Sequence, residues 1–381
     1  MKYLLIVIIA VTIGMSATVA HAHQLPENFK GFEDPEYCGG CHKAIYDEWN
    51  SSMHARSYYA GDAVHSAVYD AFAKAMTAAG KPAPYFCASC HMPTADNMAK
   101  LSSGEAGPNP ANPTNVRGVT CSFCHKADGL IEGERLYSYR ITDGIKGRGG
   151  AGAPHEVVAS DFASSYKLCM GCHGKMVNGK GGVICNAAQE GLSDCLKCHM
   201  AETDGAPATG SAGKTHAFHG MFGAHDPVTL GRGATVSLGS EMGRLLVSVK
   251  NPNPHFFPST NPMRVAYVKV EVFDAKGEIL FTNFKDDPSE DPQALLVKVF
   301  KSGDKVGVPT WEADGVAKDT RLRENEERLL TYKLPEGAAR ATAKLYYRFA
   351  APMAVTKFGI PPDGTVEMAH LVSEGELAIT K

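Results

Sequence analysis

Five copies of the pattern Cys-x-x-Cys-His constrain this chain more than any other feature of its sequence. The copies begin at Cys38, Cys87, Cys121, Cys169 and Cys195 and use ten of the eleven cysteines. In each copy the two thiols are spaced to form thioether bonds with the two vinyl groups of one haem, and the adjoining imidazole lies under the iron as its proximal ligand. The pattern therefore predicts five covalently bound haem c groups.

The five copies define two sets of site residues. The predicted thioether cysteines are Cys38, Cys41, Cys87, Cys90, Cys121, Cys124, Cys169, Cys172, Cys195 and Cys198, and the predicted proximal ligands are His42, His91, His125, His173 and His199. Zinc is the alternative, because zinc knuckles also use paired Cys-x-x-Cys. Zinc does not require a histidine directly after the second cysteine, whereas all five copies have one, so the pattern favours haem. Cys185 has no histidine at this spacing and is predicted to be a buried or incidental thiol.

The N-terminus predicts a secretory signal peptide. Met1-Lys2-Tyr3 precedes an apolar run from Leu4 to Met15, and Ala20-His21-Ala22 offers a cleavage site before His23. No later apolar run reaches the roughly 18 residues that indicate a membrane-spanning helix. We therefore expect a periplasmic or extracellular protein without a transmembrane segment after cleavage. Covalent haem attachment outside the bacterial inner membrane agrees with this location.

Local signals predict helices and loops around the haem motifs. Asp34 and Pro35 have the residue types of a helix N-cap and first turn, so a helix is expected to run from there toward Trp49, and another from about Asp62 to Ala79. The stretches 101–118 and 143–154 are rich in small residues and are expected to be loops. Five flat apolar cofactors would then supply most of the buried surface.

The character of the sequence changes beyond His225. Short runs rich in β-branched and aromatic residues, separated by turn signals, lie at 245–249, 265–273, 295–300, 328–334 and 343–349. They predict an antiparallel β-sandwich. A length of 381 residues also favours more than one domain. The predicted fold is α+β with two domains: a signal peptide at 1–22, a haem-packed, mainly α and loop pentahaem cytochrome domain at 23–226, and a β-sandwich at 227–381.

The number of spare histidines is the main test of function, because a haem iron with two protein ligands passes electrons, whereas an open face can bind a small molecule. Outside the motifs and the signal peptide the chain has nine histidines, enough to cap all five irons. The candidate distal ligands are His54, His65, His155, His216, His219 and His255. His370 is expected to be structural, and the methionines after two motifs, Met92 and Met200, are expected to pack rather than ligate.

The motifs and their surroundings resemble the multihaem cytochromes c related to the tetrahaem electron acceptor of hydroxylamine oxidation. The resemblance covers about Pro35 to Gly220 and rests on the haem motifs, on Trp49-x-x-Ser52-x-His54-Ala55 and on His216-x-Phe218-x-Gly220. It implies haems in closely stacked pairs, mostly with two histidine ligands, and it implies His54, His155 and His216 as distal ligands. This chain departs from the tetrahaem pattern in having five motifs and a C-terminal β-domain.

A second resemblance concerns Asn251-Pro-Asn-Pro-His255-Phe-Phe-Pro258, which is similar to a motif in β-domains fused to multihaem cytochromes. It implies His255 as a ligand, although the glycines of that motif are missing here. Packing of His255 on Phe256 and Phe257 is the alternative.

These features predict an electron carrier rather than an enzyme. Five haem motifs within residues 38–199 predict a path for one-electron exchange in respiratory transport, with other cytochromes or a quinol-linked complex as redox partners. Assembly into an extracellular filament is a variant of this prediction. A net charge of −3 gives no sign of a nucleic-acid partner. The alternative is a multihaem oxidoreductase that uses one five-coordinate haem on a small nitrogen or sulfur compound. No catalytic side chains are predicted.

Overall fold

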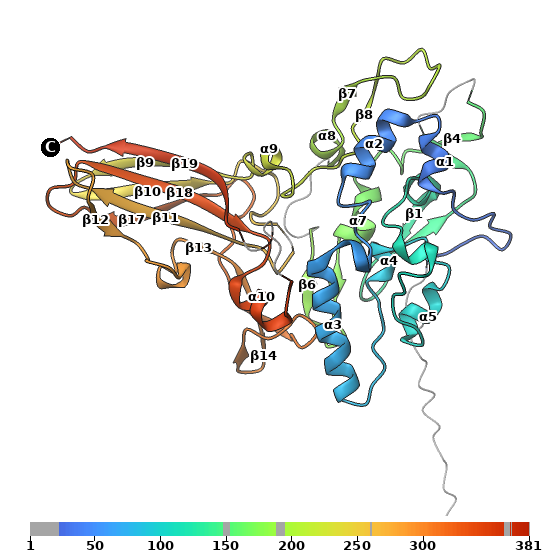
Figure 1. Ribbon diagram of the computed structural model, residues 1–381, viewed down its shortest axis with the longest axis horizontal. Coiled ribbons are helices and arrows are strands. Elements are labelled where there is room, and N and C mark those ends of the chain that lie inside the picture. Colours follow the sequence, from blue (N-terminus) through green and yellow to red (C-terminus); the bar gives the residue numbers. More distant parts are fainter. Residues whose placement is uncertain are drawn as a thin grey trace, which may run out of the picture.

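The computed structural model describes residues 23–147, 153–187, 195–259, 261–361, 366 and 368–380, so the signal-peptide prediction lies outside the described residues. Helices and loops dominate the N-terminal part, and long strands dominate the C-terminal part (Figure 1). The predicted α+β class is therefore confirmed. Within the described ranges, no helix combines the length and the apolar character needed to cross a membrane.

The first two helices carry the first haem motif between them. Helix α1 (Pro35–Gly39) has Asp34 at its N-cap, and α2 (Lys43–Ser51) begins after His42. His42 has φ −95° and ψ 52°, which is not helical, so the single helix predicted toward Trp49 is broken at the motif. The indole Nε1 of Trp49 donates to the carbonyl of Val119 at 2.8 Å and thereby ties α2 to the chain before the third motif.

Helix α3 (Ala63–Ala78) agrees with the prediction from about Asp62 to Ala79. The Asp62 carboxylate accepts hydrogen bonds from the backbone N–H groups of Val64 and His65, as expected of an N-cap. Just beyond the helix, Gly80 has φ +66°, which favours glycine.

The other haem motifs lie on short helices joined by loops and two-stranded pairs. The motif helices are α4 (Ala88–His91), α6 (Cys121–Lys126), α7 (Lys167–His173) and α8 (Cys195–His199). The connecting elements are η1 (Tyr59–Gly61), α5 (Met98–Ser103), η2 (Pro113–Val116), β1 (Ala127–Ile131), β2 (Ser138–Ile141), β3 (Ile145–Gly147), β4 (Val157–Ala159), β5 (Met176–Val177), β6 (Val183–Cys185), β7 (Glu202–Asp204) and β8 (Thr215–Ala217). The predicted loop at 101–118 thus contains the end of α5 and the η2 turn.

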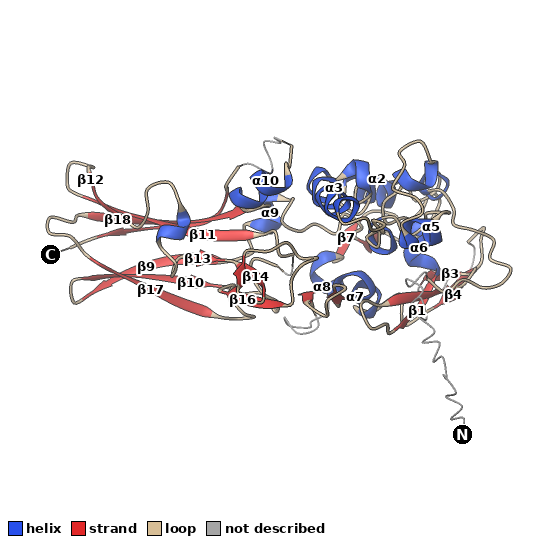
Figure 2. Ribbon diagram, turned by 90° about the horizontal axis from the view of Figure 1, so that it is seen from below, coloured by secondary structure: helices blue, strands red, loops and turns tan. Residues whose placement is uncertain are grey.

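Two antiparallel sheets form the C-terminal part and face each other as two layers (Figure 2). One has the order β17 (Glu327–Lys333), β10 (Arg244–Lys250), β9 (Thr235–Glu241), and the other has the order β12 (Ile279–Thr282), β11 (Val265–Phe273), β18 (Arg340–Arg348), β19 (His370–Ala378), with β13 (Leu295–Leu296) also paired to β11. Alternate residues such as Leu245 and Val247 on β10 and Val268 and Val270 on β11 are buried in one apolar core. Such period-2 burial is expected of strands that cover a core with one face.

The predicted strand at 295–300 is divided in the structure. Its first residues form β13, and the rest form β14 (Lys298–Ser302), which pairs with β15 (Lys305–Val306) and β16 (Gly315–Asp319) in a separate small sheet. The remaining short elements are α9 (Pro227–Leu230), η3 (Pro288–Glu290) and α10 (Pro352–Phe358).

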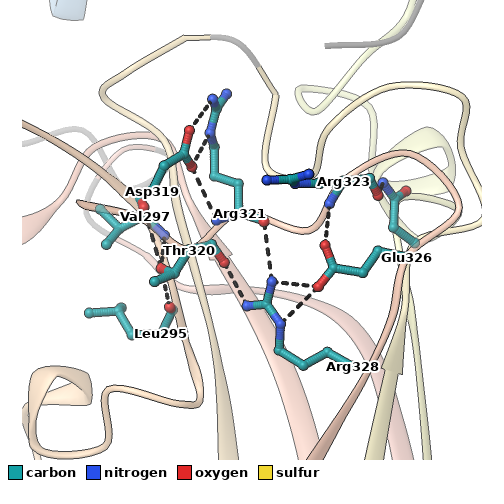
Figure 3. Close-up of polar contacts among 9 residues, drawn as sticks. Leu295, Val297, Asp319, Thr320, Arg321, Arg323, Glu326 and Arg328 are labelled. Atoms are coloured by element: carbon teal, nitrogen blue, oxygen red, sulfur yellow. Dashed lines mark hydrogen bonds and ion pairs between the residues drawn. The ribbon is translucent and has the colours of Figure 1, made fainter. Parts of the chain in front are cut away.

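A network of arginine side chains fixes the segment between β16 and β17 (Figure 3). Arg321, which is 5% exposed, pairs with Asp319 at 2.7 Å and donates to the carbonyl of Ser259 at 3.2 Å. Arg328 pairs with Glu326 at 2.6 Å and donates to the carbonyl of Thr320 at 2.7 Å.

This segment in turn holds the loop that carries His255. Phe257 and Leu322 exchange two backbone hydrogen bonds, at 2.9 and 2.8 Å, and the Arg321 guanidinium lies over the Phe256 ring. The His255 loop is therefore pinned to the sheet on one side.

The strand-rich part contacts the haem-motif part at two places. At the first, the buried Asn178 amide donates to the carbonyls of Thr310 and Ala313 at 2.6 and 2.7 Å, next to a small core of Ile184, Phe300 and Ala313. At the second, α3 and α10 share an apolar cluster that includes Ala67 and Ile360. The two parts are thus joined by packed side chains as well as by the chain.

Candidate haem sites

In the third, fourth and fifth motifs both cysteines lie on one short helix, three residues apart, so the two thiols lie on the same face; in the first and second motifs one cysteine lies just outside the helix. Among the described residues, no group of three or more His, Cys, Asp and Glu side chains converges on a position that could hold a metal ion.

The motif histidines are oriented as haem ligands would be. In four motifs Nδ1 lies within hydrogen-bond distance of a backbone carbonyl: His42 with Pro207 at 2.6 Å, His91 with Ser57 at 2.8 Å, His125 with Lys146 at 2.6 Å and His199 with Phe222 at 2.7 Å. A carbonyl only accepts, so Nδ1 carries the proton and Nε2 is left with a lone pair for a metal. This arrangement fits a haem iron bound at Nε2.

Burial also keeps these imidazoles in the form that binds metals. Desolvation by burial lowers the pKa of His125 and of His173 below the ordinary value, and neighbouring histidines lower it further. A histidine whose pKa is lowered is neutral at pH 7, and only the neutral ring can ligate iron.

Three candidate distal histidines face a motif histidine across a gap of the right size for one iron. The ring centres of His42 and His155 are 6.3 Å apart, those of His125 and His219 are 6.3 Å apart, and those of His54 and His173 are 6.1 Å apart. Two metal–nitrogen bonds of about 2 Å, with about 1 Å from each nitrogen to its ring centre, give a separation of about 6 Å. The structure therefore brings His155, His219 and His54 to positions that suit distal ligation.

Two of these three distal candidates are also held neutral. Burial lowers the pKa of His54 to about 4, with further lowering by His173, His91 and His199. Burial likewise lowers the pKa of His219 to about 4. Both rings can therefore offer a lone pair at neutral pH.

His65 is placed differently from these pairs. Its ring stacks on that of His91 with centres 3.9 Å apart and planes 8° apart, and its Nε2 lies 2.6 Å from the Tyr85 hydroxyl. An iron does not fit between rings at that distance, so the geometry does not support the predicted distal role for His65.

His216 also departs from the prediction. Its Nδ1 lies 2.9 Å from the carbonyl of Gly205, and its Nε2 lies 2.9 Å from Oε1 of Glu48. Burial acts to lower the pKa of His216, but the hydrogen bonds to Gly205 and Glu48 outweigh burial and raise it. Neither nitrogen is left for iron, so the geometry favours His219 over His216 in this segment.

His255 lies in the pinned loop, with Nδ1 3.1 Å from the carbonyl of Phe256. In the part of the chain that the structure describes, its ring has no ring contact with a motif histidine, so its predicted ligand role has no geometric support here. His225 and His370 both pack on the Phe349 ring, with centres 4.1 and 5.1 Å away, which agrees with the structural role expected of His370.

Contacts between thiols show which haem motifs are neighbours in space. No local sequence pattern predicts these neighbours. Cys38 lies within interaction distance of Cys121, Cys90 of Cys172, and Cys169 of Cys195. The first motif therefore adjoins the third, and both the second and the fifth adjoin the fourth.

The third and fourth motifs are linked as well, because Cys124 is close enough to Cys169 and Cys172 to act on them electrostatically. The five motifs thus form one connected group. Cys41 of the first motif and Cys198 of the fifth are exposed, so the group reaches the surface at both places.

Sequence reasoning missed the groups that orient the ligands. They are the carbonyls of Ser57, Lys146, Pro207 and Phe222 and the carboxylate of Glu48. Every residue has a carbonyl, so no residue type signals the first four. Glu48 contacts His216 across 168 residues, and nothing local marks that pairing.

Residues 37–126, which include the first three motifs, match the family described as cytochrome c554 and c-prime. Among solved structures, a penta-haem cytochrome c552 from Thermochromatium tepidum is similar at 26% identity with a TM-score of 0.76, over 91% of this chain and 99% of that one. Both similarities support a multihaem cytochrome c.

The similarity to the penta-haem protein covers more than the haem motifs. A match over 91% of this chain necessarily extends into the strand-rich C-terminal part. A search of curated proteins finds no match. The two similarities support covalently bound haem c and redox partners.

Proposed function

We propose that this chain is an exported pentahaem c-type cytochrome that transfers electrons along closely spaced, mostly bis-histidine haems in respiratory electron transport. The observation that carries the proposal is the set of three histidine pairs at iron-bridging separation, His42–His155, His125–His219 and His54–His173. Fully ligated haem irons suit electron transfer because they have no open face for a substrate.

The residues have separate tasks in this proposal. The ten motif cysteines hold five haems through thioether bonds, and the five motif histidines bind the irons from one side. Each haem supplies reversible one-electron Fe(III)/Fe(II) exchange. The backbone carbonyls at Nδ1 fix the ring orientation of four proximal ligands, and the buried setting of His54 and His219 excludes water from their irons.

The contacts among the motifs support a continuous path. Electrons would enter or leave at the exposed first and fifth motifs and would pass through the third and fourth, with the second as a branch from the fourth. Other cytochromes or a quinol-linked complex would be the partners. Assembly into an extracellular filament is a variant of the same proposal.

The proposal includes the division of the chain. Residues 1–22 would be removed on export to the periplasm or the cell exterior, residues 23–226 would form the pentahaem domain, and residues 227–381 would form a β-sandwich. The two facing sheets and their shared core support the sandwich, and the N-cap Asp226 of α9 supports the boundary. A relation to the tetrahaem acceptor of hydroxylamine oxidation remains a proposal that the family match over residues 37–126 supports.

Mass spectrometry and electron paramagnetic resonance test this function together. We expect the purified holoprotein to exceed its processed polypeptide by five haem masses, and the oxidised protein to give low-spin signals from at least three haems. Fewer than five haem masses would refute the count. Predominantly high-spin signals at full haem content would refute the bis-histidine carrier.

A second candidate function rests on the position of His65. Since His65 stacks beside His91 instead of facing it, the iron of the second motif is a candidate for an open face, as a multihaem oxidoreductase acting on a small nitrogen or sulfur compound would require. Carbon monoxide should then bind the reduced protein, and His65→Ala should leave the number of reactive haems unchanged. One additional reactive haem in His65→Ala would instead identify His65 as a distal ligand.

A further inference from the structure

Glu48 connects helix α2 to the segment that follows the last haem motif. Its Oε1 accepts from Nε2 of His216 at 2.9 Å, and its Oε2 accepts from the backbone N–H of His219 at 2.8 Å. The Glu48 side chain is 19% exposed and that of His216 is 3% exposed. One carboxylate therefore binds two points of the same short segment, away from bulk water.

The histidine on this carboxylate is an imidazolium. Nδ1 of His216 faces the carbonyl of Gly205 at 2.9 Å, and Nε2 faces the Glu48 carboxylate, so both neighbours are acceptors and both ring nitrogens must donate. The result is a buried, charge-assisted pair, which is stronger than a neutral hydrogen bond.

Glu48 contacts the segment from His216 to His219 at the point where the pairing of strand β8 ends. Strand β8 pairs with β7 as far as Ala217, and Phe218 N–H still donates to the carbonyl of Ala201 at 3.0 Å. At His219 the backbone N–H is bound by Glu48 instead, while its Nδ1 lies 2.6 Å from the carbonyl of Ala217. Nε2 of His219 is then left for iron, on the side where its ring faces that of His125 at 6.3 Å.

Helix α2 also reaches the opposite side of the same haem site. Trp49, the neighbour of Glu48, bonds the carbonyl of Val119 at 2.8 Å, two residues before the third motif begins at Cys121. Adjacent residues of one helix thus anchor the proximal and the distal side of this site.

We propose that Glu48 is a positioning residue for the third haem: it sets the distance between His219 and His125 by clamping the segment from His216 to His219. This role rests on the proposed ligation of that haem by His219. Without the carboxylate, the buried imidazolium loses its counter-charge and the His219 backbone loses its anchor, so the segment shifts and the distal bond weakens.

The test uses the full-length holoprotein with electron paramagnetic resonance and carbon monoxide binding, after haem content is confirmed at five. His219→Ala should convert one haem in five to a high-spin, carbon monoxide-reactive form. Glu48→Ala should convert a large fraction of the same single haem, and Glu48→Asp, which retracts the carboxylate, should convert part of it. Asp47→Ala, an exposed neighbour on α2 that pairs with Lys43, is the matched control and should convert none.

Glu48→Gln distinguishes positioning from charge. Its amide oxygen can accept from His219 N–H, and its amide N–H can donate to Nε2 of a neutral His216, so we expect the low-spin signal to be kept. Low-spin signals equal to those of the wild type in both Glu48→Ala and Glu48→Asp, with one haem converted in His219→Ala, would overturn the role of Glu48 alone. An unchanged His219→Ala protein would overturn the ligation and the role of Glu48 together.

Discussion

At the scale of single residues, the neighbours of each ring nitrogen separate ligands from structural histidines. His216 and His219 lie three residues apart, yet His216 has acceptors at both nitrogens and His219 has only one, at Nδ1. Burial acts to lower the pKa of both rings. The hydrogen bonds to Gly205 and Glu48 outweigh burial in His216, whose pKa is raised, whereas burial prevails in His219, whose pKa is lowered. The position of a histidine in the sequence does not reveal this difference.

His54 should be essential for one haem only. It is buried and faces His173 at 6.1 Å, so His54→Ala should leave one iron of five with an open face, turn it high spin and let it bind carbon monoxide after reduction. The Soret and carbon monoxide difference spectra measure this change. His370→Ala, which removes a ring packed on Phe349, is the control and should leave all irons as they were. If His54→Ala binds no carbon monoxide at full haem content, His54 is not a distal ligand.

The sequence predicted some of these residues and not others for a physical reason. Haem attachment depends on five consecutive residues, so a local pattern is sufficient to predict it. His54, His155 and His219 were among the predicted ligands, and the structure gives each a partner ring. His65 and His216 were also among the predicted ligands, but contacts with Tyr85 and Glu48 occupy them, and such contacts between distant residues leave no local pattern.

At the scale of helices and strands, runs rich in β-branched and aromatic residues made β10, β11, β17 and β18 predictable to within a few residues. Helix α3 was predictable because its N-cap and its terminating glycine are local signals. The break between α1 and α2, at the non-helical backbone of His42, was not predicted.

The ion pair between Asp319 and Arg321 should make the stability of the sheets depend on pH. Burial acts to raise the pKa of Asp319, but the hydrogen bonds and charge of Arg321 outweigh it and lower the pKa below its usual range. A carboxyl with a lowered folded pKa stabilises the fold above its unfolded pKa of about 3.9, and this stabilisation disappears as the pH falls through the folded pKa. The pair is partly exposed, so we expect Asp319→Asn to cost about 1 to 2 kcal/mol at pH 7.

Urea unfolding followed by far-ultraviolet circular dichroism measures this effect. The midpoint of Asp319→Asn should lie below that of the wild type at pH 7, and the two midpoints should converge as the pH is lowered below about 4. Asp286→Asn removes the same charge from an exposed position and serves as the control. A difference between Asp319→Asn and the wild type that stays constant down to pH 2 would show that the ion pair is not its source.

At the scale of the whole molecule, the haem-motif part is held together mainly by contacts around the motifs, whereas the strand-rich part has its own apolar core. The sequence indicated this contrast through the change of character beyond His225. It did not indicate which residues join the two parts. Asn178 and Ala313, for example, lie 135 residues apart, and neither is a residue type that signals a contact between the two parts.

Asn178 should control the attachment of the strand-rich part without affecting the irons. Its amide N–H groups donate to the carbonyls of Thr310 and Ala313, and its Oδ1 accepts from the backbone N–H groups of Lys180 and Gly182, all at a buried position. Asn178→Ala leaves these groups without partners, at about 1 kcal/mol or more for each hydrogen bond lost. We expect faster amide hydrogen exchange in residues 310–314 and in the hairpin at 178–186. The low-spin signals should stay unchanged, because the histidine pairs lie within the haem-motif part.

Lys180→Ala serves as the control. It removes an exposed hydrogen bond to the carbonyl of Glu312 and should change the rate of amide hydrogen exchange little. Loss of a low-spin haem in Asn178→Ala at full haem content would instead mean that the strand-rich part helps to hold an iron ligand in place.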